Sequence, residues 1–450
     1  MGRLFGTDGA RGVANTELTC ELSMQIGRAA AVVLTKNLNG KKPKVLIGLD
    51  TRASSQMLEN AITAGLCSVG ADVLKLGVVP TPAVAYLVKE YGYDAGIMIS
   101  ASHNPCEYNG IKIFQSNGYK LPDALENEIE AIILDNAIEI PTPIGGGVGK
   151  AKRKADAIND YIEHLLSATN MSFKGYKIAL DCANGSSSVS AEEVFTRLGA
   201  EVVVISDKPD GVNINKDCGS THLENLQRVV VENGCDLGFA FDGDADRMLA
   251  VDEQGNIIDG DQIMAIIGNH MKSQGKLKHD TIVATVMSNL GFYIMARERG
   301  LNIEQTKVGD RYVLERMREI DASLGGEQSG HVIFLEENTT GDGLLSALHL
   351  LQVMVETGKS LSELASIMSV MPQALVNAKV PTHKKDKYME YPEIAKAIEE
   401  LEAKFAGEGR VLIRPSGTEP KVRVMIEGKE QKVIEQEARK LADLIQNTML

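Results

Sequence analysis

The 450-residue chain has no long hydrophobic run, and its basic residues are fewer than its acidic ones. The longest unbroken apolar stretches, such as residues 29–34, are far shorter than the roughly 20 residues that span a bilayer, so we expect no membrane-spanning helix. Lysine and arginine number 47 against 61 aspartates and glutamates, which gives a net charge of −14. This balance disfavours nucleic acids and anionic membranes as partners. A site for an acidic ligand must therefore gather its few cations locally.

Neither the N-terminus nor the cysteines indicate export. The first residues lack the apolar core of a secretory signal, and Gly6 stands where N-myristoylation requires Ser or Thr. The six cysteines include no CxxC pair, which is typical of reduced thiols in a cytoplasm. We therefore expect a cytoplasmic protein.

Several common catalytic motifs are also missing. The glycine-rich segment 145–150 departs from a Walker A sequence, because Ile144 replaces its first glycine and Ala151 replaces its Ser or Thr. No GxGxxG motif follows a predicted strand, and neither an HExxH nor a GxSxG motif occurs. Binding of ATP or NAD, zinc-dependent hydrolysis and serine hydrolase chemistry are therefore disfavoured.

A β-α-β-α-β pattern occurs three times in the first three quarters of the chain. Each copy has three short apolar runs separated by helix-compatible segments, and the runs lie at 44–51, 70–80 and 94–101, then at 177–182, 199–208 and 236–242, and finally at 280–289, 300–309 and 321–326. Such units predict three α/β domains with mostly parallel sheets and helices on both faces.

The C-terminal part follows a different pattern. Residues 407–429 are typical of two strands around a turn, and a charged amphipathic helix is expected over 430–446. This predicts a smaller α+β domain. Turn-rich linkers are expected at 141–150, near 252–257 and around 371–372. The predicted domains therefore span residues 1–152, 153–253, 254–369 and 370–450.

A polar loop follows the third strand of each repeat. Ligands of open α/β sheets bind beyond the carboxyl ends of the strands, so these loops are where chemistry is expected. The loops are Ser100–Pro105, Asp242–Arg247 and Glu327–His331.

The second of these loops, DGDADR, places Asp242, Asp244 and Asp246 at alternate positions. Three carboxylates supply the oxygen ligands that a hard divalent cation prefers, and magnesium is the natural candidate. An EF-hand is excluded because Arg247 stands where that loop needs glycine. The alternative to a metal site is a solvated acidic turn. Three protein carboxylates also leave a place for a phosphate or substrate oxygen.

The first loop offers two serines and His103, and side-chain chemistry does not choose between Ser100 and Ser102. Taken alone, the loop could be a serine-stabilised turn with a surface histidine. Beside a metal site, one of these serines could instead carry a phosphoryl group bound to the metal.

Two further segments indicate a phosphosugar ligand. Arg414, Lys421 and Arg423 surround a turn with hydroxyls and a glycine, an arrangement suited to a phosphate. The loop 325–331 combines a carboxylate, an amide, a hydroxyl and an imidazole, which suits a hydroxyl-rich ligand such as a sugar. Either segment alone would be an ordinary turn or polar loop.

Taken in order, five segments resemble the α-D-phosphohexomutase family, and the match covers the whole chain. They are residues 5–12 (FGTDGARG), 100–105 (SASHNP), 242–247 (DGDADR), 325–331 (GGEQSGH) and 414–420 (RPSGTEP). The resemblance implies an isomerase in which three similar α/β domains and a smaller C-terminal α+β domain surround a central cleft.

The resemblance also implies roles for individual residues. Ser102 is the expected phosphoserine, and one of its phosphate oxygens completes the shell of a single Mg²⁺ held by Asp242, Asp244 and Asp246. Around the reacting phosphate we expect Arg11, Lys112, Arg247 and His331. The substrate is expected to contact His103 and Asn104, with its hydroxyls on Glu327 and Ser329 and its non-reacting phosphate on Arg414, Ser416, Gly417, Thr418 and Arg423.

Gln328 and residues 338–347 resemble most the bacterial branch of the family that acts on glucosamine phosphates, whereas branches acting on mannose or glucose phosphates commonly have another residue at position 328. The implied reaction passes a phosphoryl group from Ser102 to the 1-hydroxyl of glucosamine 6-phosphate. It proceeds through a hexosamine 1,6-bisphosphate to glucosamine 1-phosphate, which feeds UDP-N-acetylglucosamine synthesis. Lys112 and His331 are the candidate acid and base groups.

Three alternatives stay open at this point. The chain could act on mannose or glucose phosphates as a phosphomannomutase or phosphoglucomutase. It could be a magnesium-dependent phosphatase with Asp242 as nucleophile, although Asp246 replaces the Thr or Val usual in such motifs. It could also be a sugar-phosphate sensor without activity. The sequence leaves the oligomeric state open, with a homodimer as one candidate.

Overall fold

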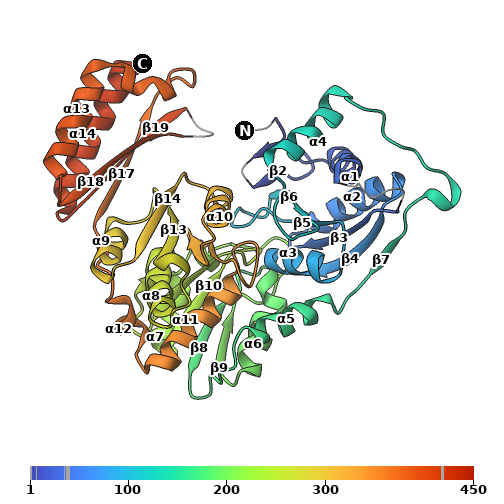
Figure 1. Ribbon diagram of the computed structural model, residues 1–450, viewed down its shortest axis with the longest axis horizontal. Coiled ribbons are helices and arrows are strands. Elements are labelled where there is room, and N and C mark those ends of the chain that lie inside the picture. The colour runs from blue at the N-terminus through green and yellow to red at the C-terminus, as the bar shows by residue number, and fades with distance from the viewer. Residues whose placement is uncertain (1–2, 7, 35, 37–40, 417–419) are drawn as a thin grey trace. The chain divides into compact units, whose positions relative to one another are not determined.

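The computed structural model describes residues 3–6, 8–34, 36, 41–416 and 420–450, and it contains four β-sheets with flanking helices (Figure 1). The chain divides into a larger unit, Met1–Met287 with Gly300–Ile367, and a smaller unit, Ser288–Arg299 with Met368–Leu450. The larger unit holds three of the sheets and the smaller unit holds the fourth.

The first sheet has seven strands in the order β1-β2-β6-β5-β3-β4-β7. They are β1 (Phe5–Gly6), β2 (Gly9–Val13), β3 (Lys44–Leu49), β4 (Asp72–Val78), β5 (Ala95–Ile99), β6 (Tyr108–Gln115) and β7 (Ala151–Arg153). Strand β5 is buried along its whole length, as its uninterrupted apolar sequence predicts. Its helices are α1 (Cys20–Leu34), α2 (Ser55–Ser68), α3 (Thr81–Glu90) and α4 (Asp123–Asp135).

Helices cover both faces of this first sheet. Side chains of α1, α2 and α4 share one core with residues such as Ile47 and Ile97 of the central strands. On the other face, α3 approaches so closely that a side chain at Gly48 would overlap Val84. The central strands of the sheet are therefore covered on both faces.

The second sheet has the order β12-β11-β10-β8-β9 and the third has the order β14-β13-β15-β16. The second contains β8 (Lys177–Asp181), β9 (Glu201–Ile205), β10 (Leu237–Phe241), β11 (Met248–Asp252) and β12 (Ile257–Ile258), with helices α5 (Ala157–Ser167), α6 (Ala191–Arg197) and α7 (Glu224–Asn233). The third contains β13 (Thr281–Thr285), β14 (Asn302–Thr306), β15 (Leu324–Gly326) and β16 (Val332–Phe334), with helices α8 (Gly260–Ser273), α10 (Asp310–Glu319), α11 (Gly343–Thr357) and α12 (Leu361–Ala365).

One topology recurs in all three sheets. The first strand of each repeat (β3, β8 or β13) lies between the second and third strands and runs parallel to both. The predicted β-α-β-α-β units and their parallel pairing are thereby confirmed. A fourth strand, which the apolar pattern did not reveal, then returns antiparallel beside the third (β6, β11 or β16).

The smaller unit is an antiparallel sheet of order β17-β19-β18 with helices packed on it. It contains β17 (Gln373–Lys379), β18 (Gly409–Pro415), β19 (Lys421–Gly428), α13 (Pro392–Phe405) and α14 (Gln431–Met449). Helix α9 (Leu290–Arg299) also belongs to this unit. In Figure 1, α13 and α14 lie side by side against the three strands. The two predicted strands and the final helix are confirmed, while β17 and α13 were not anticipated.

One predicted linker, near residues 252–257, has regular structure. Residues 252–257 form the tight turn of a hairpin inside the second sheet, because β11 pairs antiparallel with β12. The Asp252 side chain accepts hydrogen bonds from the backbone N–H groups of Gln254 and Asn256, which fixes the turn. The polar, glycine-containing sequence that suggested a linker is therefore the sequence of a hairpin turn.

In the described part of the chain, the helices are all too short or too polar to cross a membrane.

Candidate active site

The three polar loops of the larger unit follow β5, β10 and β15, the third strands of their repeats. Backbone hydrogen bonds join their surroundings. Thr81 N–H, at the start of α3, donates to the Asp244 carbonyl at 2.9 Å, and Gly343 N–H, at the start of α11, donates to the Ala245 carbonyl at 3.0 Å. Met248 N–H donates to the Gly330 carbonyl at 3.1 Å. The acidic loop is thus held by all three domains of this unit.

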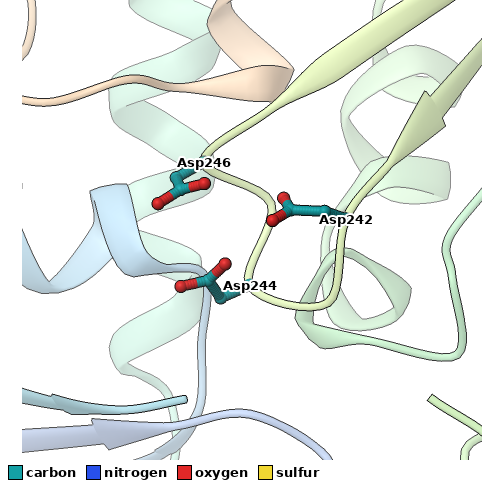
Figure 2. Close-up of side chains that lie close together, drawn as sticks. All are labelled: Asp242, Asp244 and Asp246. Carbon is teal, nitrogen blue, oxygen red and sulfur yellow. The ribbon is translucent and has the colours of Figure 1, made fainter. Parts of the chain in front are cut away.

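The acidic loop connects the hairpin strands β10 and β11, and its three aspartates are buried. Figure 2 shows the side chains of Asp242, Asp244 and Asp246 projecting from the loop toward a common space. One carboxylate oxygen from each lies within 4.8 Å of the other two. The solvated acidic turn, which the sequence left as an alternative, is therefore not what the loop forms.

The hydrogen bonding of this group fits a divalent cation. Asp242 is satisfied by Ser102 Oγ and by the Arg247 N–H. In contrast, Oδ1 of Asp244 and Oδ1 of Asp246 are buried and accept no hydrogen bond from the described residues. Buried carboxylate oxygens without a donor are costly, and a hard cation relieves that cost.

Lys112, on β6, supplies positive charge beside the aspartates. Its side chain is 1% exposed, and Nζ donates to Asp244 Oδ2 at 2.7 Å and to Asp246 Oδ2 at 3.0 Å. Burial opposes the charged form of this amine, but the Asp244 and Asp246 carboxylates prevail and raise the pKa of Lys112 well above its usual value. Lys112 therefore carries a positive charge here.

The pKa of Asp242 also reflects the closeness of the three carboxylates. Burial, and then the nearby Asp246 and Asp244 carboxylates, raise the pKa of Asp242 well above the ordinary value. Three carboxylates in one dry space resist ionising together, so a further cation is needed for all three to be charged.

The two candidate serines have different partners. Ser100 Oγ is fully buried and donates to Asp50 Oδ2 at 2.7 Å, away from the acidic loop. Ser102 Oγ donates to Asp242 Oδ2 at 2.6 Å. Ser102 also has a left-handed backbone with φ of 53°. Of the two hydroxyls, only that of Ser102 lies against the aspartates.

His103 and Arg247 flank the serine. His103 Nδ1 lies 3.3 Å from Ser102 Oγ and 3.3 Å from Arg247 Nη1. Burial, together with the positive charges of Arg247 and Arg11, lowers the pKa of His103 to about 4. His103 is therefore a neutral imidazole near pH 7 that can accept a hydrogen bond. The predicted residue Asn104 contributes its backbone carbonyl, which accepts from Arg52 and Asn215.

A network of ion pairs, which the sequence did not reveal, reaches from Lys112 to His331. Asp8 Oδ2 lies 3.5 Å from Lys112 Nζ, and Asp8 also pairs with Arg11 and Lys120. Lys120 pairs in turn with Asp310, whose Oδ2 lies 3.6 Å from His331 Nε2. Asp8 lies within the segment 5–12 that resembles the family, so the sequence could have indicated it. Lys120 and Asp310 lie in segments without a recognisable pattern.

The loop of Glu327 folds back on its own domain. Glu327 Oε1 accepts a hydrogen bond from the Gly309 N–H at 3.0 Å, and Ser329 is exposed. Gln328 Nε2 donates to Asp259 Oδ2 at 3.1 Å. Asp259 is the N-cap residue of α8, so this bond connects the loop to the start of that helix. The structure therefore explains Gln328 by its contact with the protein, while Glu327 and Ser329 lie at the loop surface.

In the smaller unit, Arg414 of β18 stands directly opposite Arg423 of β19. Burial, and then the charge of Arg423, lower the pKa of Arg414. Like charges at opposing positions of two strands are destabilising, and an anion between them removes the conflict. Ser416 is buried beside them, whereas Gly417 and Thr418 lie outside the described residues.

Four profiles of one family match consecutive parts of the chain. They are the phosphoglucomutase/phosphomannomutase alpha/beta/alpha domain I over residues 2–138, domain II over 159–255, domain III over 259–371, and the C-terminal domain over 375–444.

Whole-length relatives agree with these matches. The chain is 59% identical to the phosphoglucosamine mutase of Acetivibrio thermocellus and 58% identical to that of Ruminiclostridium cellulolyticum, in both cases over 100% of each chain. A crystal structure of a phosphoglucomutase/phosphomannomutase family protein from Burkholderia thailandensis superposes with a TM-score of 0.81 at 25% identity, covering 99% of this chain and 98% of that one. The chain therefore belongs to the α-D-phosphohexomutase family and is an isomerase of phosphorylated sugars.

Proposed function

We propose that this enzyme interconverts glucosamine 6-phosphate and glucosamine 1-phosphate through a phosphoserine at Ser102. The observation that carries the proposal is the 2.6 Å contact between Ser102 Oγ and Asp242 Oδ2, beside two carboxylate oxygens that lack donors. The whole-length relatives at 58–59% identity, which are phosphoglucosamine mutases, support the choice of glucosamine. The product would feed UDP-N-acetylglucosamine synthesis in the cytoplasm.

The reaction consists of two phosphoryl transfers. In the first, the 1-hydroxyl of glucosamine 6-phosphate attacks the phosphorus on Ser102, so the P–Oγ bond breaks and a P–O1 bond forms. The 1-hydroxyl loses its proton and Ser102 Oγ gains one. The resulting glucosamine 1,6-bisphosphate then presents its other end. Ser102 Oγ loses its proton and attacks the 6-phosphorus, the P–O6 bond breaks, O6 gains a proton, and glucosamine 1-phosphate leaves. Lys112 and His331 are the groups proposed to carry these protons.

The surrounding residues are arranged to stabilise charge on the transferring group. Phosphoryl transfer needs alignment and neutralisation of the phosphoryl oxygens more than covalent chemistry. Lys112, which is buried, and Arg247, which is partly buried, are positively charged and border Ser102 and the aspartates. Arg11, through its pair with Asp8, lies in the network that continues from Lys112. Together they would replace the solvation that a dianion loses in a buried site.

Asp242, Asp244 and Asp246 would hold one Mg²⁺. All their ligand atoms are hard oxygens, which Mg²⁺ prefers, and the cation when bound supplies charge neutralisation to the phosphoryl oxygens. The aspartates themselves are fixed beforehand by Thr81, Lys112 and Ser102. The protein thus prepares the site before the metal binds.

The non-reacting phosphate is proposed to bind the arginine pair of the smaller unit. Arg414 and Arg423 place two guanidinium groups at opposing positions of two strands, and Ser416 lies beside them. Gly417 and Thr418 are proposed to complete the clamp. Glu327 and Ser329 are proposed to bind the sugar hydroxyls. Because the bisphosphate turns around, each of its ends must fit each of the two places in turn.

Replacing Ser102 by Ala should abolish mutase activity even when glucosamine 1,6-bisphosphate is supplied, because no oxygen then accepts the phosphoryl group. Intact-mass and peptide measurements of the wild-type chain after incubation with the bisphosphate should show one phosphate, on Ser102. Near-normal turnover of Ser102→Ala, or a phosphate on Ser100, would refute the phosphoserine assignment.

Asp244→Asn should lower the affinity for Mg²⁺ by at least about tenfold, because a charged oxygen ligand is lost. Titration calorimetry on the purified chain measures this directly, without substrate. The matched control is Asp252→Asn, since Asp252 is also a buried aspartate of the β10–β11 hairpin but bonds only to the 252–257 turn. Equal Mg²⁺ affinities of the two variants would argue against the aspartate site.

Arg414→Ala should raise KM for glucosamine 6-phosphate about 10- to 100-fold, the loss expected for a hydrogen bond to a charged group. Its Mg²⁺ affinity should stay within about twofold of wild type, because the aspartates belong to the other unit. Arg439→Ala, an exposed arginine of α14, is the control. An unchanged KM for Arg414→Ala would remove Arg414 from the phosphate clamp.

The choice among sugars is tested by kcat/KM on glucosamine, glucose and mannose 6-phosphates under one set of conditions. We expect glucosamine 6-phosphate to exceed both others by at least about tenfold, because a site that pairs with the amino group rejects a hydroxyl in its place. A preference for mannose or glucose phosphate would make the enzyme a phosphomannomutase or phosphoglucomutase. Net release of inorganic phosphate would instead indicate a phosphatase.

A further inference from the structure

The buried guanidinium of Arg52 donates hydrogen bonds to backbone carbonyls around Ser102. Arg52 Nη2 donates to the carbonyls of Ser102 at 2.9 Å and of Asn104 at 2.8 Å, and Nη1 donates to the carbonyl of Pro105. The Arg52 side chain is fully buried. Three carbonyls of one short loop are thus turned toward the same group.

The orientation of Arg52 is itself fixed. Its Nε donates to Asp50 Oδ2 at 2.8 Å, and its backbone N–H donates to Asp50 Oδ1 at 3.0 Å. Asp50 also accepts from Ser100 Oγ and Ser55 Oγ, both at 2.7 Å. Asp50 thereby connects Arg52 to the beginning of the loop, so that the loop is braced at both ends by one buried ion pair.

A second clamp comes from the neighbouring domain. Asn215 Nδ2 donates to the same two carbonyls, those of Ser102 at 2.9 Å and of Asn104 at 3.0 Å. Asn215 is 8% exposed, and its own N–H donates to the Ala183 carbonyl at 2.9 Å. The domain that carries the three aspartates therefore also grips the loop that carries the serine.

Gly243 of the acidic loop makes this close approach possible. A Cβ at position 243 would lie 2.6 Å from the Ser102 carbonyl oxygen and 2.9 Å from Asn215 Nδ2, distances at which something must shift. The glycine between the first two aspartates thus lets the serine loop, Asn215 and the acidic loop pack against one another.

We propose that Arg52 and Asn215 are positioning residues that hold Ser102 in its left-handed conformation and so set the distance from its Oγ to the aspartates. This inference rests on the proposed phosphoserine mechanism. A non-glycine residue at φ of 53° is strained and persists only where the surroundings fix it. The four hydrogen bonds to the Ser102 and Asn104 carbonyls supply that constraint without touching the substrate.

The test compares two asparagines of one loop. Asn215→Ala and Asn215→Leu both remove the donor, and Leu retains the side-chain volume. The control is Asn213→Ala, because the Asn213 side chain bonds within its own loop, to the Lys208 carbonyl and the Asp210 N–H. Arg52→Lys, which keeps the charge but loses the planar fork, is the second probe.

For both Asn215 variants and for Arg52→Lys, kcat should fall about 10- to 100-fold, the loss that follows from a misplacement of about 1 Å, while KM stays within about threefold. Phosphorylation of Ser102 by glucosamine 1,6-bisphosphate, followed by intact mass, should slow by the same factor. Asn213→Ala should match wild type in both measurements. The melting temperature of each variant shows whether it is folded.

Two results would overturn the inference, and they are distinguishable. If the wild-type chain is phosphorylated on Ser102 but folded Asn215 and Arg52 variants react as fast as Asn213→Ala, the positioning role fails and the proposed function stands. If the bisphosphate leaves wild-type Ser102 unmodified, the proposed function fails and this inference fails with it.

Discussion

The site depends on the repulsion among three carboxylates confined in one buried space. Asp242, Asp244 and Asp246 occupy alternate positions of a hairpin loop, and each is at most 3% exposed. Water cannot screen them there, so their charge must be balanced by cations within the protein or bound to it. The ammonium of Lys112 meets part of this demand. Oδ1 of Asp244 and Oδ1 of Asp246 accept no hydrogen bond from the described residues, and they mark where the rest is required. The demand for a further cation follows from this local balance.

That concentration of charge is stabilised because groups from the other two domains of the larger unit hold the acidic loop. Thr81 at the start of α3 donates to Asp244 Oδ2 at 2.5 Å, Ser102 donates to Asp242, and the start of α11 donates to the Ala245 carbonyl. Helix N-termini favour nearby negative charge, so two of these contacts also stabilise the loop electrostatically. The recurrence of one sheet topology three times gives the molecule three strand ends from which such contacts can be built.

The arginine pair of the smaller unit follows the same logic with opposite sign. Arg414 and Arg423 stand at opposing positions of neighbouring strands, where like charges repel. An anion bound there would relieve this repulsion.

The sequence by itself determined the repeated α/β units, the smaller tail domain and most of the site. Apolar runs long enough for a buried strand, each ended by a polar loop, are local features, and so are alternate aspartates and a cluster of arginines around a turn. The returning strands β6, β11 and β16 escaped prediction. Lys112 interrupts the apolar pattern of β6, whereas β11 and β16 are apolar but only five and three residues long. Side-chain chemistry alone did not separate Ser102 from Ser100. The family resemblance indicated Ser102, and the tertiary structure shows that the two hydroxyls face different carboxylates. Arg52, Asn215, Lys120 and Asp310 join segments 50 or more positions apart in the chain, and only the tertiary structure revealed these contacts. Such contacts arise from how the sheets pack, and the residues that make them carry no signal in their own neighbourhood of the chain.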